Sequence, residues 1–165
     1  MIVIRLGPRD AEAVRDIRSE ALRLHPTAFS ADPDIEKKLT LDDWRGRLGA
    51  SVWFGSIVDG ALCAMVVFRT ETSGKTKHTG HLGAMYVREA ARGTGLADQL
   101  IEAILAHASH SVEQILLAVE AENVRAIKLY ERHGFRTIGR IPRAILVDGR
   151  YYDELQMFRA VSVNA

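Results

Sequence analysis

A glycine-containing loop at residues 92–95 constrains the fold of this chain more than any other stretch. The residues before it, Met85 to Val87, favour a β-strand, and a run of charged and small residues then breaks that strand. After the glycines, apolar residues recur at helical spacing, at Leu96, Leu100, Ile101, Ile104 and Leu105. A strand that turns through glycines into a helix presents unpaired backbone N–H groups at the positive end of the helix dipole. The stretch therefore predicts a strand–loop–helix unit whose loop suits a phosphate group.

Three phosphate-binding patterns can be compared with this loop. The Walker pattern requires Gly-Lys-Ser/Thr at the helix start, but Gly95 is followed by Leu96 and Ala97. The dinucleotide fingerprint requires a third glycine or alanine where Asp98 stands, and its acidic partner, Glu120, would lie further along the chain than usual. The third pattern, Arg/Gln-x-x-Gly-x-Gly/Ala, is met in full by RGTGLA at residues 92–97. A loop that only connects the strand to the helix is the alternative interpretation.

Composition indicates one domain, spanning residues 1–165, with enough apolar residues (47%) for a substantial core. A formal net charge of +1 argues against nucleic acid or a membrane surface as a partner. The only cysteine, Cys63, excludes an intramolecular disulfide and suits a reducing compartment. Neither a leader-like N-terminus nor an apolar run of roughly 18 residues is seen, so we expect a cytoplasmic protein.

The order of elements indicates an α/β (α+β) fold with a mixed sheet. Hydrophobic periodicity predicts the order β-α-α-β-β-β-α-β-α-β-β, with a loop at 27–38, a strand that begins at 135–141, and strand segments at 144–147 and 151–158 on either side of the second Asp-Gly pair. Asp-Gly pairs at 59–60 and 148–149 predict hairpins, which require antiparallel strands. The strand–helix–strand unit in the middle requires a parallel pair. A twisted sheet of about seven strands with helices on both faces meets both requirements.

A second motif lies at residues 123–135, NVRAIKLYERHGF. Asn123 is well placed to cap a helix, and Tyr130, about two turns later, lies on the same side of that helix. Together with residues 92–97, the motif resembles the two signatures of the GNAT superfamily of N-acetyltransferases, and it meets every fixed position of Asn-x-x-Ala-x-x-Leu-Tyr-x-x-x-Gly-Phe. The order of elements is similar to the GNAT fold over essentially the whole chain.

The resemblance implies that acetyl-coenzyme A is the co-substrate. In GNAT enzymes the central strands, here those ending at Val87 and Val119, splay apart and hold the pantetheine arm between them. The first strand then pairs with the arm through its backbone, and the loop amides hold the pyrophosphate. The expected coenzyme-binding residues are Met85, Tyr86, Val87, Arg92, Gly93, Thr94, Gly95, Leu96, Ala97, Asn123 and Tyr130.

The implied reaction is acetyl transfer to an amine, either of a small molecule or of a peptide or protein. Tyr130 is the expected general acid for the departing thiolate, and a backbone N–H near Val87 the expected oxyanion donor. His81, at the register where GNAT enzymes often carry a glutamate, is the expected general base, on one strand face with Gly83, Met85 and Val87. His78, Glu120 and bulk water are alternative proton acceptors.

The acceptor is expected beside residues 25–39 and 141–153. Side chains there and just beyond could attract a cation, namely Asp32, Asp34, Glu36, Tyr151, Tyr152, Asp153 and Glu154. His78 and His81 lack a third ligand at a suitable spacing, so no metal is expected. A homodimer is compatible with the resemblance. A non-catalytic acetyl-coenzyme A sensor is the alternative function, and Asp98 argues against an NAD-binding domain.

Overall fold

The computed structural model of the chain describes residues 2–161. The strands within these residues are β1 (Val3–Leu6), β2 (Val52–Val58), β3 (Ala61–Thr70), β4 (Thr79–Val87), β5 (Gln114–Glu120), β6 (Arg136–Val147) and β7 (Arg150–Ala160). The α-helices are α1 (Ala11–Leu24), α2 (Pro33–Glu36), α3 (Leu41–Ala50), α4 (Leu96–Ala108) and α5 (Val124–Arg132).

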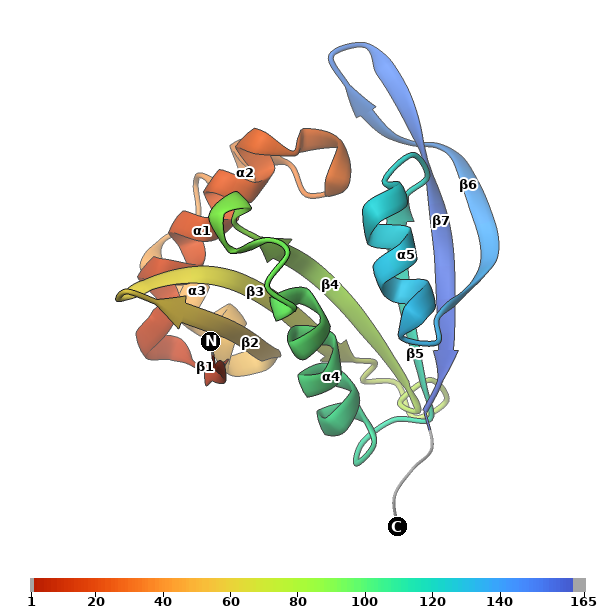
Figure 1. The fold of residues 1–165 in the computed structure, drawn as a ribbon, viewed down its shortest axis with the longest axis horizontal. Coiled ribbons are helices and arrows are strands. Elements are labelled where there is room, and N and C mark those ends of the chain that lie inside the picture. Colours follow the sequence, from red (N-terminus) through yellow and green to blue (C-terminus); the bar gives the residue numbers. More distant parts are fainter. Residues whose placement is uncertain (1, 162–165) are drawn as a thin grey trace.

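The strands form one seven-stranded sheet in the order β1-β2-β3-β4-β5-β7-β6 (Figure 1). All neighbours in it are antiparallel except β4 and β5, which are parallel. Their pairing joins residues 79–81 to 114–116 and covers only the start of each strand. Beyond this point β4 and β5 diverge, so the mixed sheet with a splayed central pair is confirmed.

Strand β4 bends at Ala84. This residue has a φ of 49°, and the register with β3 shifts between Met65 and Val67. Such a bulge places one extra residue opposite the partner strand and reverses the alternation of side chains beyond it. The bend lies in the part of β4 that no longer pairs with β5, where the two strands have diverged.

The bulge changes which face His81 occupies. Leu82, Met85 and Val87 pack against one apolar cluster, whereas Tyr86 belongs to the cluster on the other face. Because successive side chains on a strand point to opposite faces, His81 faces away from Leu82 and therefore away from Met85 and Val87. The sequence-based alternation that grouped His81 with Met85 and Val87 was wrong, since it assumed an unbroken strand.

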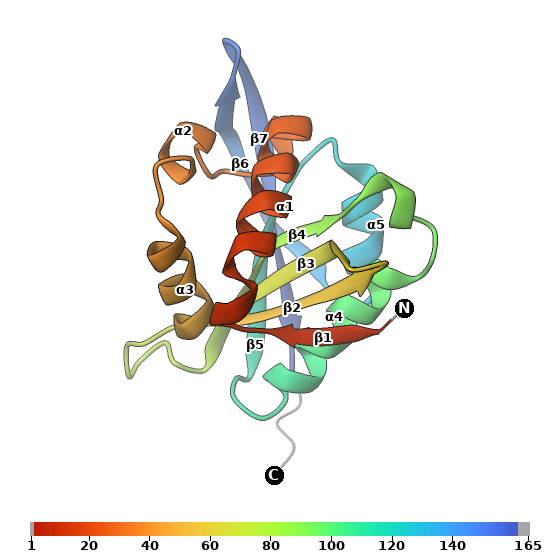
Figure 2. The ribbon, with the colours of Figure 1, turned by 90° about the vertical axis from the view of Figure 1, so that its left-hand side faces the viewer.

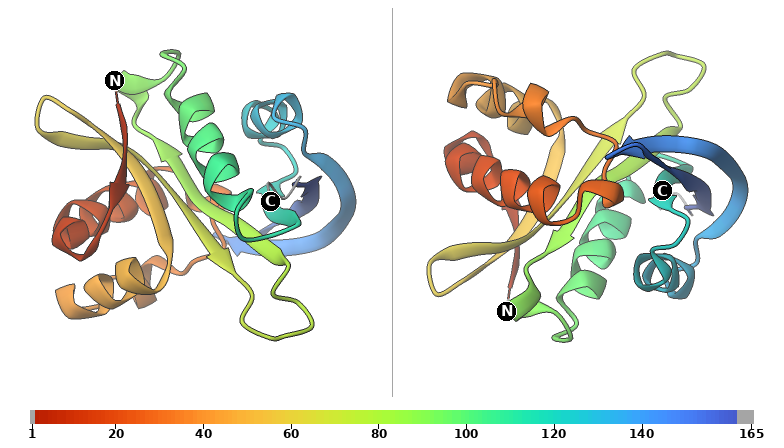
Figure 3. Two further views of the ribbon diagram at one scale, coloured as in Figure 1. Left: turned by 90° about the horizontal axis from the view of Figure 1, so that it is seen from below. Right: turned by 90° about the horizontal axis from the view of Figure 1, so that it is seen from above.

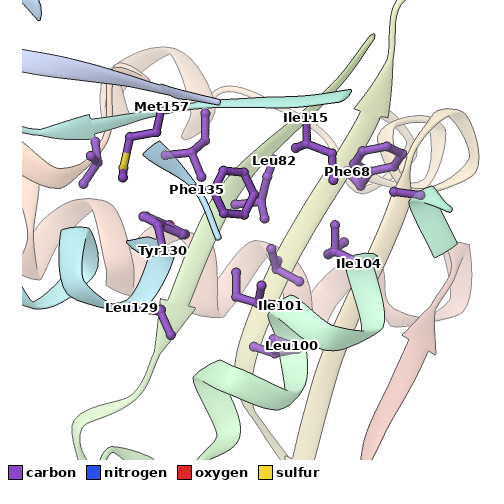
Figure 4. Packing of buried hydrophobic residues seen from close by; sticks show 14 of the residues in the cluster. Phe68, Leu82, Leu100, Ile101, Ile104, Ile115, Leu129, Tyr130, Phe135 and Met157 are labelled. Atoms are coloured by element: carbon purple, nitrogen blue, oxygen red, sulfur yellow. The ribbon is translucent and has the colours of Figure 1, made fainter. Parts of the chain in front are cut away.

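Helices cover both faces of the sheet (Figures 2 and 3). One face packs against α1 and α3, with Ile17, Trp44 and Trp53 in its cluster. The other face packs against α4 and α5 and contains the larger cluster, which includes Leu100, Ile104, Phe135 and Met157 (Figure 4). Helices α1, α3, α4 and α5 bury apolar residues against the sheet, so the sheet is held between two apolar layers.

Two segments differ from the sequence-based expectation. Residues 27–38 were expected as a loop but contain the short helix α2, because Asp32 caps its N-terminus through the amide of Asp34 and Pro33 starts it. The strands expected at 135–141 and 144–147 form one strand, β6, with an irregular register between Ile141 and Ile145. This strand lies at the sheet edge, where the missing N–H of Pro142 is tolerated.

Candidate active site

A cavity of about 510 Å³ lies where β4 and β5 diverge. Its walls come from the end of β4, the glycine-containing loop, the first turn of α4, the end of β5 and one side of α5. All the residues predicted to bind the coenzyme line it except Thr94, whose hydroxyl donates to the carbonyl of Ala91 at 2.7 Å. The fold therefore brings the two sequence motifs to one concave site, although they belong to separate elements.

The loop enters α4 through two glycines in the left-handed region. Gly93 has a φ of 76° and Gly95, the N-cap of α4, a φ of 80°. Gly95 has no side chain with which to cap the helix, and the position of a Cβ on either glycine is open space. The first turn of α4 lines the cavity with its N-terminal end, and a helix N-terminus of this kind suits an anion.

Arg92 is fixed between two parts of the site. Its Nε donates to the carbonyl of Val87 at 3.0 Å, and one terminal nitrogen lies 3.0 Å from Nε2 of His25. Because arginine can only donate, His25 accepts this hydrogen bond and is neutral there. Burial, and then the charges of Arg92 and Arg125, lower the pKa of His25. The sequence had indicated His25 as a helix end and as the start of the segment beside the acceptor, but its contact with Arg92 was not predicted.

Tyr86 is held by a network on the far side of β4. Its hydroxyl donates to Oε1 of Glu20 at 3.0 Å, and Arg88 forms an ion pair with the same carboxylate at 2.9 Å. Burial, followed by the hydrogen bond to Glu20, raises the pKa of the Tyr86 phenol. The phenol is thus engaged in joining β4 to α1, which leaves the backbone of Tyr86 as the part available at the cavity.

Helix α5 carries Asn123 and Tyr130 along the cavity wall. Asn123 is the N-cap, as predicted, with Oδ1 accepting from the amide of Ala126 at 3.2 Å. Tyr130 is almost fully buried and packs edge-on against Phe135, with ring centroids 5.9 Å apart (Figure 4). Burial raises the pKa of Tyr130 well above its usual value, and no group within residues 2–161 hydrogen-bonds its hydroxyl. Tyr130 therefore keeps its proton at neutral pH and has it free to donate.

The side chains expected as general base lie elsewhere. His81 does not line the cavity; its Nε2 lies 2.8 Å from Oε1 of Glu71, and its side chain is 42% exposed. His78 lies just before the paired start of β4, where its carbonyl accepts from the amide of Glu113. Glu120 is buried and accepts from the amide of Glu122 at 3.0 Å. The structure thus separates all three from the concave site.

A second cavity, of about 560 Å³, adjoins the first. The two share the lining residues Ala28, Phe29, Leu82, Gly83, Ala84 and Ala118. They therefore meet at the split between β4 and β5, with Glu154 of β7 in the wall of the second cavity. Burial raises the pKa of Glu154, which brings this carboxyl closer to neutral pH. The sequence singled out Glu154 only as one of several acidic residues near the last hairpin.

Three of the other acidic side chains expected to attract a cation, those of Asp32, Glu36 and Asp153, have partners in the fold. Asp32 caps α2, and Asp153 accepts from Arg140 and from the amide of Arg143. Glu36 forms ion pairs with Arg18 and Arg47. Of the seven residues named from the sequence, only Glu36 and Glu154 line the second cavity.

An ion-pair cluster joins the two helices beside the first cavity. Asp98, in the first turn of α4, lies 2.7 Å from Nε of Arg132 and 2.8 Å from Nε2 of His133, both at the end of α5. The hydrogen bonds from Arg132, and to a lesser degree those from His133, lower the pKa of Asp98 to about 2. The cluster therefore ties α5 to the helix that carries the glycine-containing loop.

Replacing Asp98 with asparagine should lower the free energy of unfolding by ~1 kcal/mol at pH 7, a value reduced from the full pKa shift because Arg132 is half exposed. The pKa of Asp98 in the folded state lies below its unfolded value. Its contribution is therefore complete above about pH 4 and is lost as the pH falls toward 2. Urea unfolding of both proteins between pH 7 and pH 2.5 measures this difference, with Asp42→Asn, at an exposed ion pair, as the control. A difference in unfolding free energy between the two proteins that stays constant from pH 7 to pH 2.5 would contradict this prediction.

Within residues 2–161, no helix is both long and apolar enough to cross a membrane. The same residues contain no group of three histidine, cysteine or acidic side chains arranged to hold a metal ion.

Known proteins resemble this chain in both sequence and structure. Mycothiol acetyltransferase of Beutenbergia cavernae is 32% identical over 126 residues, which cover 71% of this chain and 40% of that protein. The L-methionine sulfoximine/L-methionine sulfone acetyltransferase of Pseudomonas aeruginosa PAO1 is 34% identical over 71 residues, or 42% of this chain and 41% of that protein. The chain thus spans about two fifths of the length of these curated relatives.

Solved structures share the fold at low sequence identity. A GNAT-family acetyltransferase from Streptococcus pneumoniae superposes with a TM-score of 0.86 at 20% identity, covering 97% of this chain and 98% of that one. The yncA protein of Salmonella typhimurium, solved with its cofactor acetyl-CoA, gives a TM-score of 0.82 at 22% identity, with coverage of 100% and 96%. The model of the acetyltransferase (GNAT) family matches residues 12–135. With both signature motifs gathered at one cavity in a split sheet, the chain belongs to the GNAT family of acetyltransferases.

Proposed function

We propose that this protein transfers the acetyl group of acetyl-coenzyme A to the amine of a small molecule. The observation that carries the proposal is the cavity in the split sheet, which has uncapped helix amides at one end and the free hydroxyl of Tyr130 in its wall. The family match, the acetyl-CoA present in the yncA structure and the small-molecule acceptors named for the relatives support it. The free, buried thiol of Cys63 suits the reducing cytoplasm, where we propose the protein works.

The coenzyme would lie along the cavity. Its pyrophosphate would accept hydrogen bonds from the amides at residues 93–97, next to the fixed guanidinium of Arg92. The pantetheine arm would follow the unpaired edge of β4 at Met85 and Val87, which offers backbone groups as an added strand would need. This pose brings the thioester toward Tyr130, and Asn123 lies one helix length away on the same wall.

The chemistry is direct transfer through a tetrahedral intermediate. The acceptor arrives as an ammonium ion, since the pKa of an alkylamine is near 10.4, and must lose one proton before its nitrogen attacks the thioester carbon. The new C–N bond forms as the carbonyl oxygen becomes an oxyanion, which the Val87 amide would stabilise. The C–S bond then breaks, the nitrogen loses its second proton, and Tyr130 would protonate the departing thiolate. The products are the acetylated amine, free coenzyme A and one released proton.

Glu154 is better placed than His81 to take a proton from the acceptor. It lies in the wall of the cavity that meets the coenzyme site at the β4–β5 split, whereas His81 lies outside both cavities. Its pKa is raised by burial, which suits a carboxylate to accepting a proton. We therefore assign the base role to Glu154, and keep His81, paired with Glu71, as the alternative.

Replacing Glu154 with glutamine should lower kcat/KM roughly tenfold and remove the lower inflection of its pH profile. The loss falls below the usual range for general bases because Glu154 is partly exposed and water can take the proton. His81→Gln is the matched comparison, and we expect it to change kcat/KM less than about threefold. A larger loss of kcat/KM for His81→Gln than for Glu154→Gln would show that His81 is the general base instead.

The experiment that tests the whole proposal is an amine panel assayed for release of free thiol from acetyl-coenzyme A, with mass spectrometry of the products. Release that depends on the amine, with an acetylated product, supports the enzyme. Tight acetyl-coenzyme A binding without transfer to any amine would instead support the alternative of a non-catalytic sensor. Peptides with free N-termini belong in the panel, because they test a protein acceptor against a small molecule.

A further inference from the structure

The second cavity carries a cluster of guanidinium groups from three separate elements. Arg18 comes from α1, Arg47 from α3 and Arg69 from the end of β3, and all three line the cavity. The cavity meets the coenzyme site at the β4–β5 split, so a molecule in it would reach the thioester from the side opposite the pyrophosphate. This cavity is therefore the place for the acceptor if the protein transfers acetyl groups as proposed.

Arg18 is buried with part of its hydrogen-bonding capacity unused. Its side chain is only 8% exposed, and two of its nitrogens bond the carboxylate of Glu36, at 3.0 and 3.3 Å. The remaining nitrogen, Nη1, is buried without a hydrogen-bond partner. The guanidinium lies 4.9 Å from the ring centre of Phe29, a residue that lines both cavities. A buried, charged donor left unpaired is costly, so this position favours a ligand that accepts a hydrogen bond.

The other charges leave the cavity positive. Glu36 also accepts from Arg47, at 3.3 Å, so its carboxylate is shared between two guanidinium groups. Arg69 has no ion pair within residues 2–161, and burial, together with the charges of Arg18 and Arg47, lowers its pKa. Three guanidinium groups face two carboxyl groups, those of Glu36 and Glu154, which gives a net charge of +1 even when both carboxyls are ionised.

We propose that the acceptor is a small amine that also carries a carboxylate. Its anionic group would bind to Arg18 Nη1 and to Arg69, while its amine would face Glu154 and the split between β4 and β5. Guanidinium groups bind carboxylates with charge-assisted hydrogen bonds, which gives both affinity and orientation. This inference rests on the proposed acetyl transfer, and it reverses the sequence-based expectation of a cavity that attracts a cation through acidic side chains.

The test compares acceptors that differ only in the anionic group. Each L-amino acid is assayed with its α-carboxamide and with its decarboxylated amine, for example phenylalanine, phenylalanine amide and phenethylamine, by thiol release from acetyl-coenzyme A. We expect kcat/KM at least about tenfold higher for the best acids than for their amides, since the amides leave the guanidinium groups without an anion. The amide has the more acidic ammonium group, which favours its attack, so a preference for the acid is not a consequence of amine basicity.

Arginine variants test whether the guanidinium groups cause the preference for acids over amides. Arg69→Gln should reduce the ratio of acid to amide at least about fivefold, because it removes a guanidinium that lines the cavity and has no ion pair within residues 2–161. Arg18→Lys keeps the charge near Glu36 but removes the spare donor, and it should reduce the ratio as well. Arg45→Gln, at an exposed ion pair on α3 outside both cavities, is the matched control and should leave the ratio unchanged.

The possible outcomes separate the two proposals. Transfer to amides and simple amines at rates equal to or above those of the acids would overturn the carboxylate site and leave the acetyltransferase proposal standing. A preference for acids that survives Arg69→Gln and Arg18→Lys would also overturn it. Absence of thiol release with every acceptor, including neutral amines and peptides, would count against both.

Discussion

Replacing Tyr130 with phenylalanine is expected to lower kcat at least ~10²-fold while changing the dissociation constant of acetyl-coenzyme A less than about threefold. The substitution removes one hydroxyl from a buried wall and leaves the ring, which packs against Phe135 at 5.9 Å, in place. Burial holds the pKa of this phenol above its usual value, so at neutral pH it carries the proton that a thiolate needs. The loss should therefore appear in the step that breaks the C–S bond.

Two measurements distinguish this role from a structural one. Calorimetry with acetyl-coenzyme A and thermal unfolding should give nearly the same values for both proteins, because no group within residues 2–161 bonds the hydroxyl. Acyl donors with a more acidic thiol need less help from an acid, so they should restore much of the rate of Tyr130→Phe. An unchanged kcat, or a loss that is the same for every thiol, would remove Tyr130 from the acid role.

Replacing Gly95 with valine is expected to weaken acetyl-coenzyme A binding at least ~10²-fold. Gly95 has a φ of 80°, a conformation that costs an L-residue ~1–2 kcal/mol and a β-branched residue more. The space at its Cβ is open in the structure, and this is the space that the pyrophosphate would occupy at the uncapped start of α4. The valine side chain would thus block the anion site and strain the loop that forms it.

Gly60 provides a matched control for the strain. It has a φ of 78° with open space at its Cβ, but it lies in the hairpin between β2 and β3, away from both cavities. Gly60→Val should lower stability by a similar amount and leave the coenzyme dissociation constant unchanged in calorimetry. Equal affinity losses in the two variants would show a general folding defect, and retained affinity in Gly95→Val would refute the assignment of the loop.

Local sequence patterns accounted for much of the fold and for the residues that line the first cavity. The hairpin glycines, the cap at Asn123 and the turn through Gly93 and Gly95 are each determined by a few neighbouring residues, because dihedral preferences and capping act over short distances. The same is true of the apolar stripes on α4 and α5, which indicate the face that each helix buries. Short-range patterns of this kind were therefore enough to place both motifs on their elements.

The lining of the second cavity was decided only by tertiary structure. Strand alternation put His81 beside Met85, but the bulge at Ala84 reversed it, and an alanine in an apolar strand gives no sign of a positive φ. Arg18, Arg69 and Glu154 come from a helix and two strands far apart in the chain, so no local pattern connects them. The sequence determined the elements and the glycine-containing loop because these follow from near neighbours. The packing of α1, β3 and β7 determined which charges face the open sheet, because such contacts exist only once the chain has folded.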